Sequence, residues 1–253
     1  MMNPALILFS CVFGAAIGSF VTVVAHRVPR AEPLVAGRSH CPNCGSQIAA
    51  YDNVPVFSWL ALHGRSRCCG QPISARYPLT EAALAALFAG VVIRFYGDAV
   101  EMALGLVFVS ILVAITLTDL ERRIIPNKVL AVGAVIGLAI VLISDPGSLP
   151  ERLAAGAGAG GVLFAAAVAY PGGMGLGDVK LAAMMGLFLG VWVVPAMLIG
   201  LLAGSVAGIA IMAKHGVSAR KQAIPFGPFL AFGGVCALFA GAALIQAYLS
   251  AFA

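Results

Sequence analysis

Long apolar runs, separated by short polar segments, dominate the pattern of residues along the chain. They predict spans near residues 4–25, 78–96, 99–117, 128–143, 153–170, 179–191, 193–213 and 226–250. Most of these runs are long enough to cross the ~30 Å hydrocarbon layer of a bilayer as an α-helix. Continuous runs of this kind exclude the weak alternating pattern of a membrane β-barrel. We therefore predict an all-α polytopic membrane protein with about eight transmembrane helices.

The composition agrees with that fold class. Of the 253 residues, 61% are hydrophobic and 10% are charged, whereas soluble domains have ~25% charged residues. The first run, residues 4–25, has no basic segment before it, is longer than a signal-peptide core and lacks a convincing cleavage site, so we expect it to remain as the first transmembrane helix. The chain then divides into a helix at 1–25, a loop subdomain at 26–77 and a helical core at 78–253.

The basic residues are distributed unevenly between the predicted loops. Of the 15 Lys and Arg residues, 13 fall in the segments 26–77, 118–128, 171–180 and 214–225. Cytoplasmic loops carry such an excess, so these segments and the loop subdomain are expected on the cytoplasmic side. The formal net charge of +5 then reflects topology and contact with anionic lipid, and it gives no case for nucleic-acid binding.

A glycine-rich stretch at residues 171–180 contains Asp178 inside an otherwise almost uncharged apolar sequence. An acid within the membrane is costly, and it therefore indicates a functional group. We expect Gly175 and Gly177 to permit positive φ angles and a close backbone approach beside that acid. The same residues also fit an ordinary glycine loop whose aspartate caps the following helix.

A second carboxyl group, Asp119, follows the third predicted span, and the topology puts it on the same face as Asp178. Two aspartates within hydrogen-bond reach share one proton, which is the condition for aspartyl proteolysis. One carboxylate activates water, while the other, protonated, donates to the scissile carbonyl. Pro126 and Asn127 interrupt the chain at the same level, and Lys180 is either a positive anchor or the group that keeps Asp178 ionised.

Four cysteines of the loop subdomain form a candidate metal site. Cys41 and Cys44 make a Cys-x-x-Cys knuckle, and Cys68 and Cys69 follow in the same loop. In a reducing compartment metal ligation is more common than a disulfide, and four thiolates would hold a structural zinc. Ser66 stands where the second pair would need sulfur, so a degenerate knuckle without tightly bound zinc is the alternative.

Glu81 lies one turn inside the second predicted span. It could pair with Arg76 at the interface, which is the interpretation that we favour, or belong to the active cavity. Glycines at small-xxx-small spacing also predict close helix contacts; they are Gly14 and Gly18, and Gly156 and Gly160.

Several motifs occur together in one order: Gly18-Ser-Phe20 with Arg27-Val-Pro29, Ile73-Ser-Ala-Arg76-Tyr-Pro78-Leu-Thr-Glu81, Asp119 with Ile125-Pro126-Asn127, Gly175-Leu-Gly177-Asp178-Val-Lys180, and Pro225-Phe-Gly-Pro228. In this combination, essentially the whole chain resembles the type IV prepilin peptidases. The resemblance implies a bacterial inner-membrane aspartyl protease that cuts the basic leader from type IV prepilins or type II secretion pseudopilins, after a glycine. It also implies that Asp119 and Asp178 are the catalytic pair, supported by Gly175, Gly177, Lys180, Pro126 and Asn127.

Members of this family with a long cysteine-bearing loop often also methylate the new N-terminus, using S-adenosylmethionine. The resemblance therefore implies this second activity for the chain. The adjacent Cys68 and Cys69 depart from the family's paired Cys-x-x-Cys pattern, which bears on zinc binding. No glycine-rich loop identifies a site for the methyl donor.

Two other classes share part of these features. Presenilin-like and signal-peptide-peptidase-like proteases also use a Gly-x-Gly-Asp motif, but their first aspartate follows a tyrosine and they lack the Pro-Phe-Gly-Pro run. A proton-coupled transporter could use paired acids, but it should show internal repeats with two matched broken segments. We find no such repeat in the chain.

Overall fold

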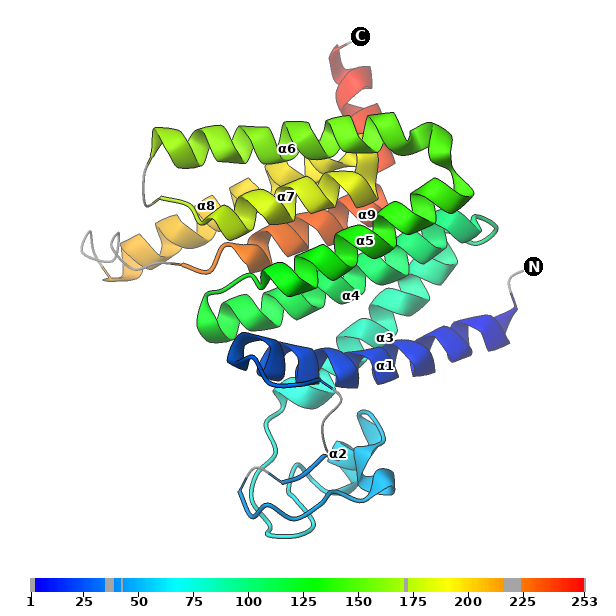
Figure 1. Cartoon of the computed structure of the whole chain (residues 1–253), viewed down its shortest axis with the longest axis vertical. Helices are drawn as coiled ribbons and strands as arrows, with labels where there is room; N and C mark the ends of the chain where they lie inside the picture. The colour runs from blue at the N-terminus through cyan, green and yellow to red at the C-terminus, as the bar shows by residue number, and fades with distance from the viewer. Residues whose placement is uncertain (1–2, 35–38, 42, 171–172, 216–223, 253) are drawn as a thin grey trace. The chain divides into compact units, whose positions relative to one another are not determined.

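The computed structural model describes residues 3–34, 39–41, 43–170, 173–215 and 224–252. Within these ranges the chain forms eight long helices, short 3-10 turns and isolated β-bridges, and no strand is present (Figure 1). The predicted all-α fold is therefore confirmed. Residues 171–172 of the glycine-rich stretch and 216–223 of the last basic loop lie outside the described residues.

Among the residues that the structure describes, seven segments are long and apolar enough to cross a membrane. The predicted number was about eight, and the difference lies in α7 (Leu176–Leu189) and α8 (Val193–His215), because only the short turn η4 (Gly190–Trp192) separates them. Gly190 ends α7 with a φ of 55°, and α8 runs back from that turn (Figure 1). Since α7 has 14 residues, it is about 21 Å long, less than the ~30 Å apolar layer. The count of eight is therefore approximate.

The first of two compact units, Met1–Gly97, contains two membrane helices and the loop subdomain between them. Its elements are α1 (Pro4–Arg27), η1 (Val28–Arg30), η2 (Ala50–Asn53), α2 (Phe57–Ala61) and α3 (Arg76–Arg94). Helices α1 and α3 pack closely, because a Cβ atom at Gly14 would lie 2.6 Å from Leu84 O and one at Gly18 would lie 2.7 Å from Glu81 Cα. The packing role expected for Gly14 and Gly18 is confirmed.

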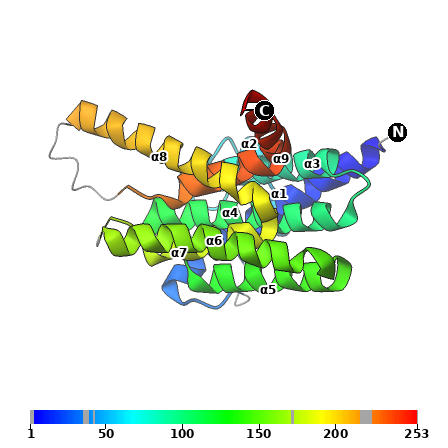
Figure 2. The ribbon, with the colours of Figure 1, turned by 90° about the horizontal axis from the view of Figure 1, so that it is seen from above.

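The second unit, Asp98–Ala253, contains the remaining helices (Figures 1 and 2). Besides α7, η4 and α8, they are α4 (Ala99–Arg122), α5 (Asn127–Ser144), η3 (Pro146–Ser148), α6 (Leu149–Ala169) and α9 (Gly227–Phe252). The most extensive pairings are α6 with α7 and α8 with α9, and α4 contacts both α5 and α9. This arrangement brings the last turn of α4 and the starts of α7 and α9 to one end of the unit.

Glycines and stacked aromatic rings hold α7 inside the second unit. A Cβ atom at Gly156 of α6 would lie 2.7 Å from Ala183 O, and one at Gly160 would lie 2.9 Å from Ala183 Cβ, so the predicted glycine pair does make a tight helix contact. The rings of Phe108 in α4 and Phe188 in α7 stack with centroids 5.3 Å apart. These contacts pack α7 against α6 on one side and α4 on the other.

Both candidate acids lie within helices rather than beside them. Helix α4 continues beyond the predicted end at residue 117 and stops at Arg122, where Arg123 adopts a left-handed φ of 55°. Helix α7 begins at Leu176, three residues earlier than predicted, after the extended residue Gly175. Polar residues at helix ends carry little apolar signal, which is why the hydrophobic pattern missed these turns.

Candidate active site and cysteine cluster

Asp119 lies in the last turn of α4, and its side chain is buried, with 5% of the residue exposed. Its Oδ2 accepts a hydrogen bond of 2.8 Å from the backbone N–H of Gly227, the first residue of α9. A Cβ atom at Gly227 would lie 2.8 Å from the same oxygen, so the approach requires glycine. The amino end of a helix favours a negative charge. The start of α9 therefore both positions and stabilises the Asp119 carboxylate.

Asp178 lies in the first turn of α7 and is also buried, with 8% exposed. Its carboxyl group is within electrostatic range of Asp119. Among the described residues, its Oδ1 is the one buried side-chain oxygen or nitrogen atom without a hydrogen-bond partner. A buried polar atom left unpaired costs about 1–3 kcal/mol. The described protein residues thus leave this oxygen available to a further hydrogen-bond partner.

The glycines beside Asp178 provide space rather than an unusual backbone. Gly175 caps α7 with a φ of −80°, and a Cβ atom there would lie 3.3 Å from Asp178 Oδ2. At Gly177 a Cβ atom would lie 3.0 Å from Ile125 Cβ. Neither glycine has a positive φ, so the left-handed backbone that glycine permits is not used at these two positions. The expected close approach is what the structure contains.

The other predicted supporting residues tie α5 to α7. Pro126 is the N-cap of α5, which begins at Asn127. The amine of Lys180 in α7 donates a hydrogen bond of 3.0 Å to Asn127 Oδ1. Lys180 therefore has a neutral partner on the neighbouring helix, and the two residues join the segments that follow Asp119 and Asp178.

The four loop cysteines come together in the first unit. Their sulfur atoms all lie within 4.8 Å of one another. The Sγ atoms of Cys41 and Cys69 are 3.7 Å apart, and those of Cys44 and Cys68 are 3.2 Å apart. Four sulfurs around a zinc ion at ~2.3 Å would be separated by about 3.8 Å. The cluster thus fits a tetrahedral zinc site with small adjustments.

Two knuckles of the same geometry build this cluster. In the first, Cys41 N–H donates to Ser46 O at 2.8 Å and Gly45 N–H donates to Cys41 O at 2.9 Å. In the second, Ser66 N–H donates to Gln71 O at 2.8 Å and Gly70 N–H donates to Ser66 O at 2.9 Å. Ser66 thus holds the position in the second knuckle that Cys41 holds in the first, as its spacing in the sequence indicated. Cys68, one residue before the knuckle's own Cys69, provides the fourth sulfur.

Hydrogen bonds within the cluster distribute its protons unevenly. The hydroxyl of Ser66, 3.0 Å from Cys69 Sγ, lowers the pKa of the Cys69 thiol to about 6. The hydrogen bond with Cys44 raises the pKa of the Cys68 thiol to about 12. Thiolates so close together repel one another. A divalent cation would relieve this repulsion.

Glu81 has a partner that neither interpretation of the sequence named. Glu81 is buried in α3, and its Oε2 accepts a hydrogen bond of 2.7 Å from the backbone N–H of Val56. The carboxylate therefore connects a membrane helix with the turn before α2.

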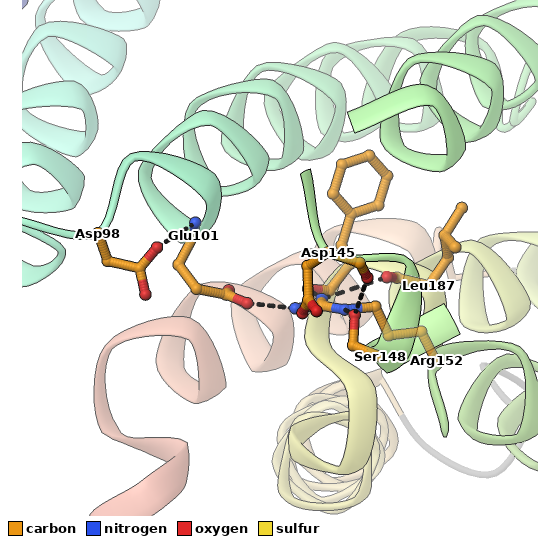
Figure 3. A network of polar contacts seen from close by, with 7 residues as sticks. Asp98, Glu101, Asp145, Ser148, Arg152 and Leu187 are labelled. Atoms are coloured by element: carbon orange, nitrogen blue, oxygen red, sulfur yellow. Dashed lines mark hydrogen bonds and ion pairs between the residues drawn. The ribbon is translucent and has the colours of Figure 1, made fainter. Parts of the chain in front are cut away.

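A second polar network, around Arg152, was not found from the sequence (Figure 3). It includes Glu101 in the first turn of α4, whereas Asp119 lies near the other end of that helix. Arg152 of α6 is buried and makes an ion pair with Glu101 of α4. Its Nη1 donates to Phe188 O at 2.7 Å, and its Nε donates to Ser148 Oγ at 3.1 Å. Arg152 therefore satisfies a carbonyl at the end of α7 and links three helices. Glu151 and Arg152, adjacent in the first turn of α6, are the only charged residues of that helix, and their sequence alone did not indicate the partners of Arg152.

Comparison with known proteins follows the division into two units. The bacterial peptidase A24 N-terminal domain matches residues 12–95, and the type IV leader peptidase family matches residues 106–213. A Bacillus subtilis protein named prepilin leader peptidase/N-methyltransferase is 36% identical over 241 residues, which are 94% of this chain and 96% of the relative. The chain belongs to the type IV leader peptidase family. The resemblance stated from the motifs is thus confirmed.

Other relatives of the same printed name extend this family assignment. A Myxococcus xanthus protein is 37% identical over 223 residues, which are 85% of this chain and 65% of that protein. One from Burkholderia pseudomallei is 34% identical over 267 residues, which are 92% of this chain and 85% of that protein. No solved structure matches the chain. Membership of the type IV leader peptidase family favours the first sequence interpretation over a presenilin-like protease or a transporter.

Proposed function

We propose that the chain is an aspartyl endopeptidase that removes the leader peptide from prepilins. The observation that carries this proposal is the pair of buried carboxyl groups, Asp119 and Asp178, which come from distant parts of the sequence to one end of the second unit. The names of the relatives support prepilins as the substrate.

The surroundings of the two acids suggest different roles for them. Asp119 accepts the Gly227 N–H at the amino end of α9, which favours its ionised form, so we assign it as the base that activates water. Asp178 has an oxygen without a partner in a buried place, so we assign it the shared proton. It would donate this proton to the scissile carbonyl oxygen, while Asp119 takes a proton from the attacking water. As the C–N bond breaks, Asp119 would pass its proton to the leaving amine and Asp178 would regain its own from a hydroxyl group of the tetrahedral intermediate.

The substrate would approach the pair from the cytoplasmic side. The positive-inside rule supports this orientation for an inner-membrane protein, because the basic segments precede or follow the helix ends that carry Asp119 and Asp178. A basic leader would stay in the cytosol while the apolar helix of a prepilin or pseudopilin lies in the bilayer. A glycine before the cut would let the peptide backbone approach closely. Single cysteines at 119 and 178 in a cysteine-free variant should react with an impermeant thiol reagent from the cytoplasmic side, and labelling from the outside would contradict this topology.

The loop subdomain, residues 26–77, is proposed to hold a structural zinc ion through Cys41, Cys44, Cys68 and Cys69. Such an ion would stabilise a segment that is too short to form a large core. The names of the relatives also support N-methylation of the new N-terminus, for which S-adenosylmethionine would supply the methyl group. This second activity is tested by measuring the mass of a processed prepilin after incubation with and without that donor. A product whose mass does not increase by one methyl group when the donor is present would reject it.

The proteolytic proposal is tested by replacing each acid with its amide. Asp119→Asn and Asp178→Asn keep the size of the side chain but remove its ability to exchange a proton. We expect each variant to lose at least about 100-fold in kcat for leader cleavage, since general acid–base groups contribute 10²–10⁴-fold. The matched control is Asp145→Asn, because Asp145 is exposed at the opposite end of the unit. Substantial cleavage by either variant would remove that residue from the catalytic pair.

A further inference from the structure

The short helix α2 presents apolar side chains outward. Phe57 is 73% exposed and Leu60 is 57% exposed, and both lie on this helix of five residues. Val54, just before it, and Tyr51 in η2 are exposed as well. Clustered apolar side chains of this kind are unfavourable in water, and they mark a surface that binds lipid or another molecule.

A strained turn precedes α2. Val56 has a φ of 62° and a ψ of −53°, and Phe57 N–H donates to Pro55 O at 2.6 Å. This is a γ-turn with positive φ at its central residue, which is the rare and strained form. A β-branched residue at positive φ is a genuine outlier that persists only where surrounding contacts hold it.

The contact that holds this turn comes from a membrane helix. Val56 N–H donates at 2.7 Å to Glu81 Oε2, and Glu81 is buried between α1 and α3, where Gly18 approaches its Cα. Helix α3 has 19 residues with Arg76 and Arg94 at its ends, so at about 28 Å it just spans the apolar layer. Glu81 is about 7–8 Å inside its Arg76 end. The turn is therefore attached at the depth of the lipid headgroups and the adjoining acyl chains.

We propose that α2 with its preceding turn is an in-plane membrane anchor, with Val54, Phe57 and Leu60 inserted at the boundary between headgroups and acyl chains. Interfacial helices bury their apolar face about 5–10 Å deep, which matches the depth of Glu81. Charge also favours a lipid surface as the occupant. Residues 26–77 contain six Arg residues and only two acidic ones, Glu32 and Asp52, which suits anionic lipid. The inference does not depend on the proposed proteolytic function.

The anchor would also give the loop subdomain a defined place. The segment from Arg65 to Pro72 that forms the second cysteine knuckle follows α2 directly, and Trp59 Nε1 of α2 donates to Ile73 O at 3.0 Å, just beyond that segment. Because α2 is tied to the turn on one side and to the knuckle on the other, anchoring α2 would hold the cysteine cluster close to the membrane surface.

Photo-crosslinking of the full-length chain tests this proposal. A diazirine-bearing amino acid is placed singly at Phe57 or at Leu60, and the purified protein is illuminated in vesicles of phosphatidylethanolamine and phosphatidylglycerol. Mass spectrometry then distinguishes phospholipid adducts from peptide adducts. The positive reference is the same amino acid at Leu8, which is exposed on α1, and the negative reference is Gln47 in the first knuckle.

We expect positions 57 and 60 to form phospholipid adducts at a yield close to that of position 8 and several-fold above that of position 47. Peptide adducts with a second copy, or adducts with water alone, would overturn the proposal and indicate a protein partner or a solvated surface. Glu81→Ala should lower the yield at position 57 several-fold, whereas Glu81→Gln should preserve it, because an amide oxygen still accepts the Val56 N–H. An unchanged yield at position 8 shows that α1 is still inserted, and an unchanged yield at 57 in Glu81→Ala would refute the attachment by Glu81.

Discussion

The contact between Gly227 and Asp119 allows a sharp test of how the candidate site is built. Gly227→Ala would put a Cβ atom 2.8 Å from Asp119 Oδ2, closer than such atoms approach in folded proteins. The carboxylate would therefore have to move, and the 2.8 Å hydrogen bond from Gly227 N–H would be lost or lengthened. We expect the variant to fold but to hold the proposed base out of place.

The size of the effect follows from the hydrogen bond that is lost. A hydrogen bond to a charged group contributes about 1.5–3 kcal/mol. If this stabilisation is needed in the transition state, kcat should fall roughly 10- to 150-fold, because about 1.4 kcal/mol corresponds to a factor of ten. The KM for the prepilin should change little, since Gly227 acts on Asp119 and not on the substrate's apolar helix.

The assay is the rate of leader cleavage from a purified prepilin in detergent or vesicles, measured together with the thermal unfolding of each variant. Gly234→Ala is the matched control on the same helix, because its Cβ atom would meet only the side-chain ends of Leu112, Met185 and Phe108 at 3.0–3.2 Å. We expect Gly234→Ala to keep most of its kcat. The reasoning is refuted if Gly227→Ala cleaves like the unmodified chain, or if both variants lose activity only in proportion to their loss of stability.

Two further predictions concern the cysteine cluster and the buried arginine. The purified chain should contain one zinc ion, and Cys68→Ser should lower the zinc content as much as Cys44→Ser, whereas Cys236→Ser should not; metal analysis well below one zinc per chain would contradict the proposed site. Arg152→Met should lower the unfolding temperature by several degrees. Breaking a buried ion pair costs up to about 3–5 kcal/mol, and this pair should cost less because Glu101 is partly exposed. Each kcal/mol shifts the unfolding temperature of a domain of this size by about 2–4 °C. Arg152→Lys should lose less, and an unchanged unfolding temperature in Arg152→Met would show that the network contributes nothing.

The membrane helices could be predicted from the sequence because apolar runs of sufficient length have few alternative structures in a bilayer. The proximity of Asp119 and Asp178 could also be anticipated, since counting spans places both at the same end. The ends of α4 and α7 could not be located as well. The caps lie among polar and glycine residues outside the apolar runs: Arg123 ends α4 later than predicted, and Gly175 lets α7 begin earlier.

The Gly227 contact had no signal that a single sequence could reveal. The donor is a backbone N–H, which every residue except proline carries, and it lies 108 positions from its acceptor. The interrupted helix start at Pro225-Phe-Gly-Pro228 marked the place as irregular, but only the pairing of α4 with α9 shows which acid it reaches. Cys68 differs in kind: the sequence named it as a candidate ligand, and the structure shows how an adjacent pair of cysteines brings four sulfurs together. Cys69 occupies the knuckle position, and Cys68 lies beside Cys44.

The glycines around the two acids serve one of the two purposes that the sequence left open. A glycine-rich sequence indicates either a left-handed backbone or close packing, and the amino-acid sequence alone does not distinguish the two. At Gly175, Gly177 and Gly227 the structure shows close packing, with Cβ positions 2.8–3.3 Å from neighbouring atoms. The helix starts of α7 and α9 can therefore lie directly against carboxyl groups, one in its own first turn and the other from α4. Because both helices direct their amino ends at this place, the surrounding backbone favours negative charge there. Unlike a flexible glycine loop, such an arrangement holds its charges in position before a substrate arrives, which is the condition for electrostatic stabilisation of a transition state.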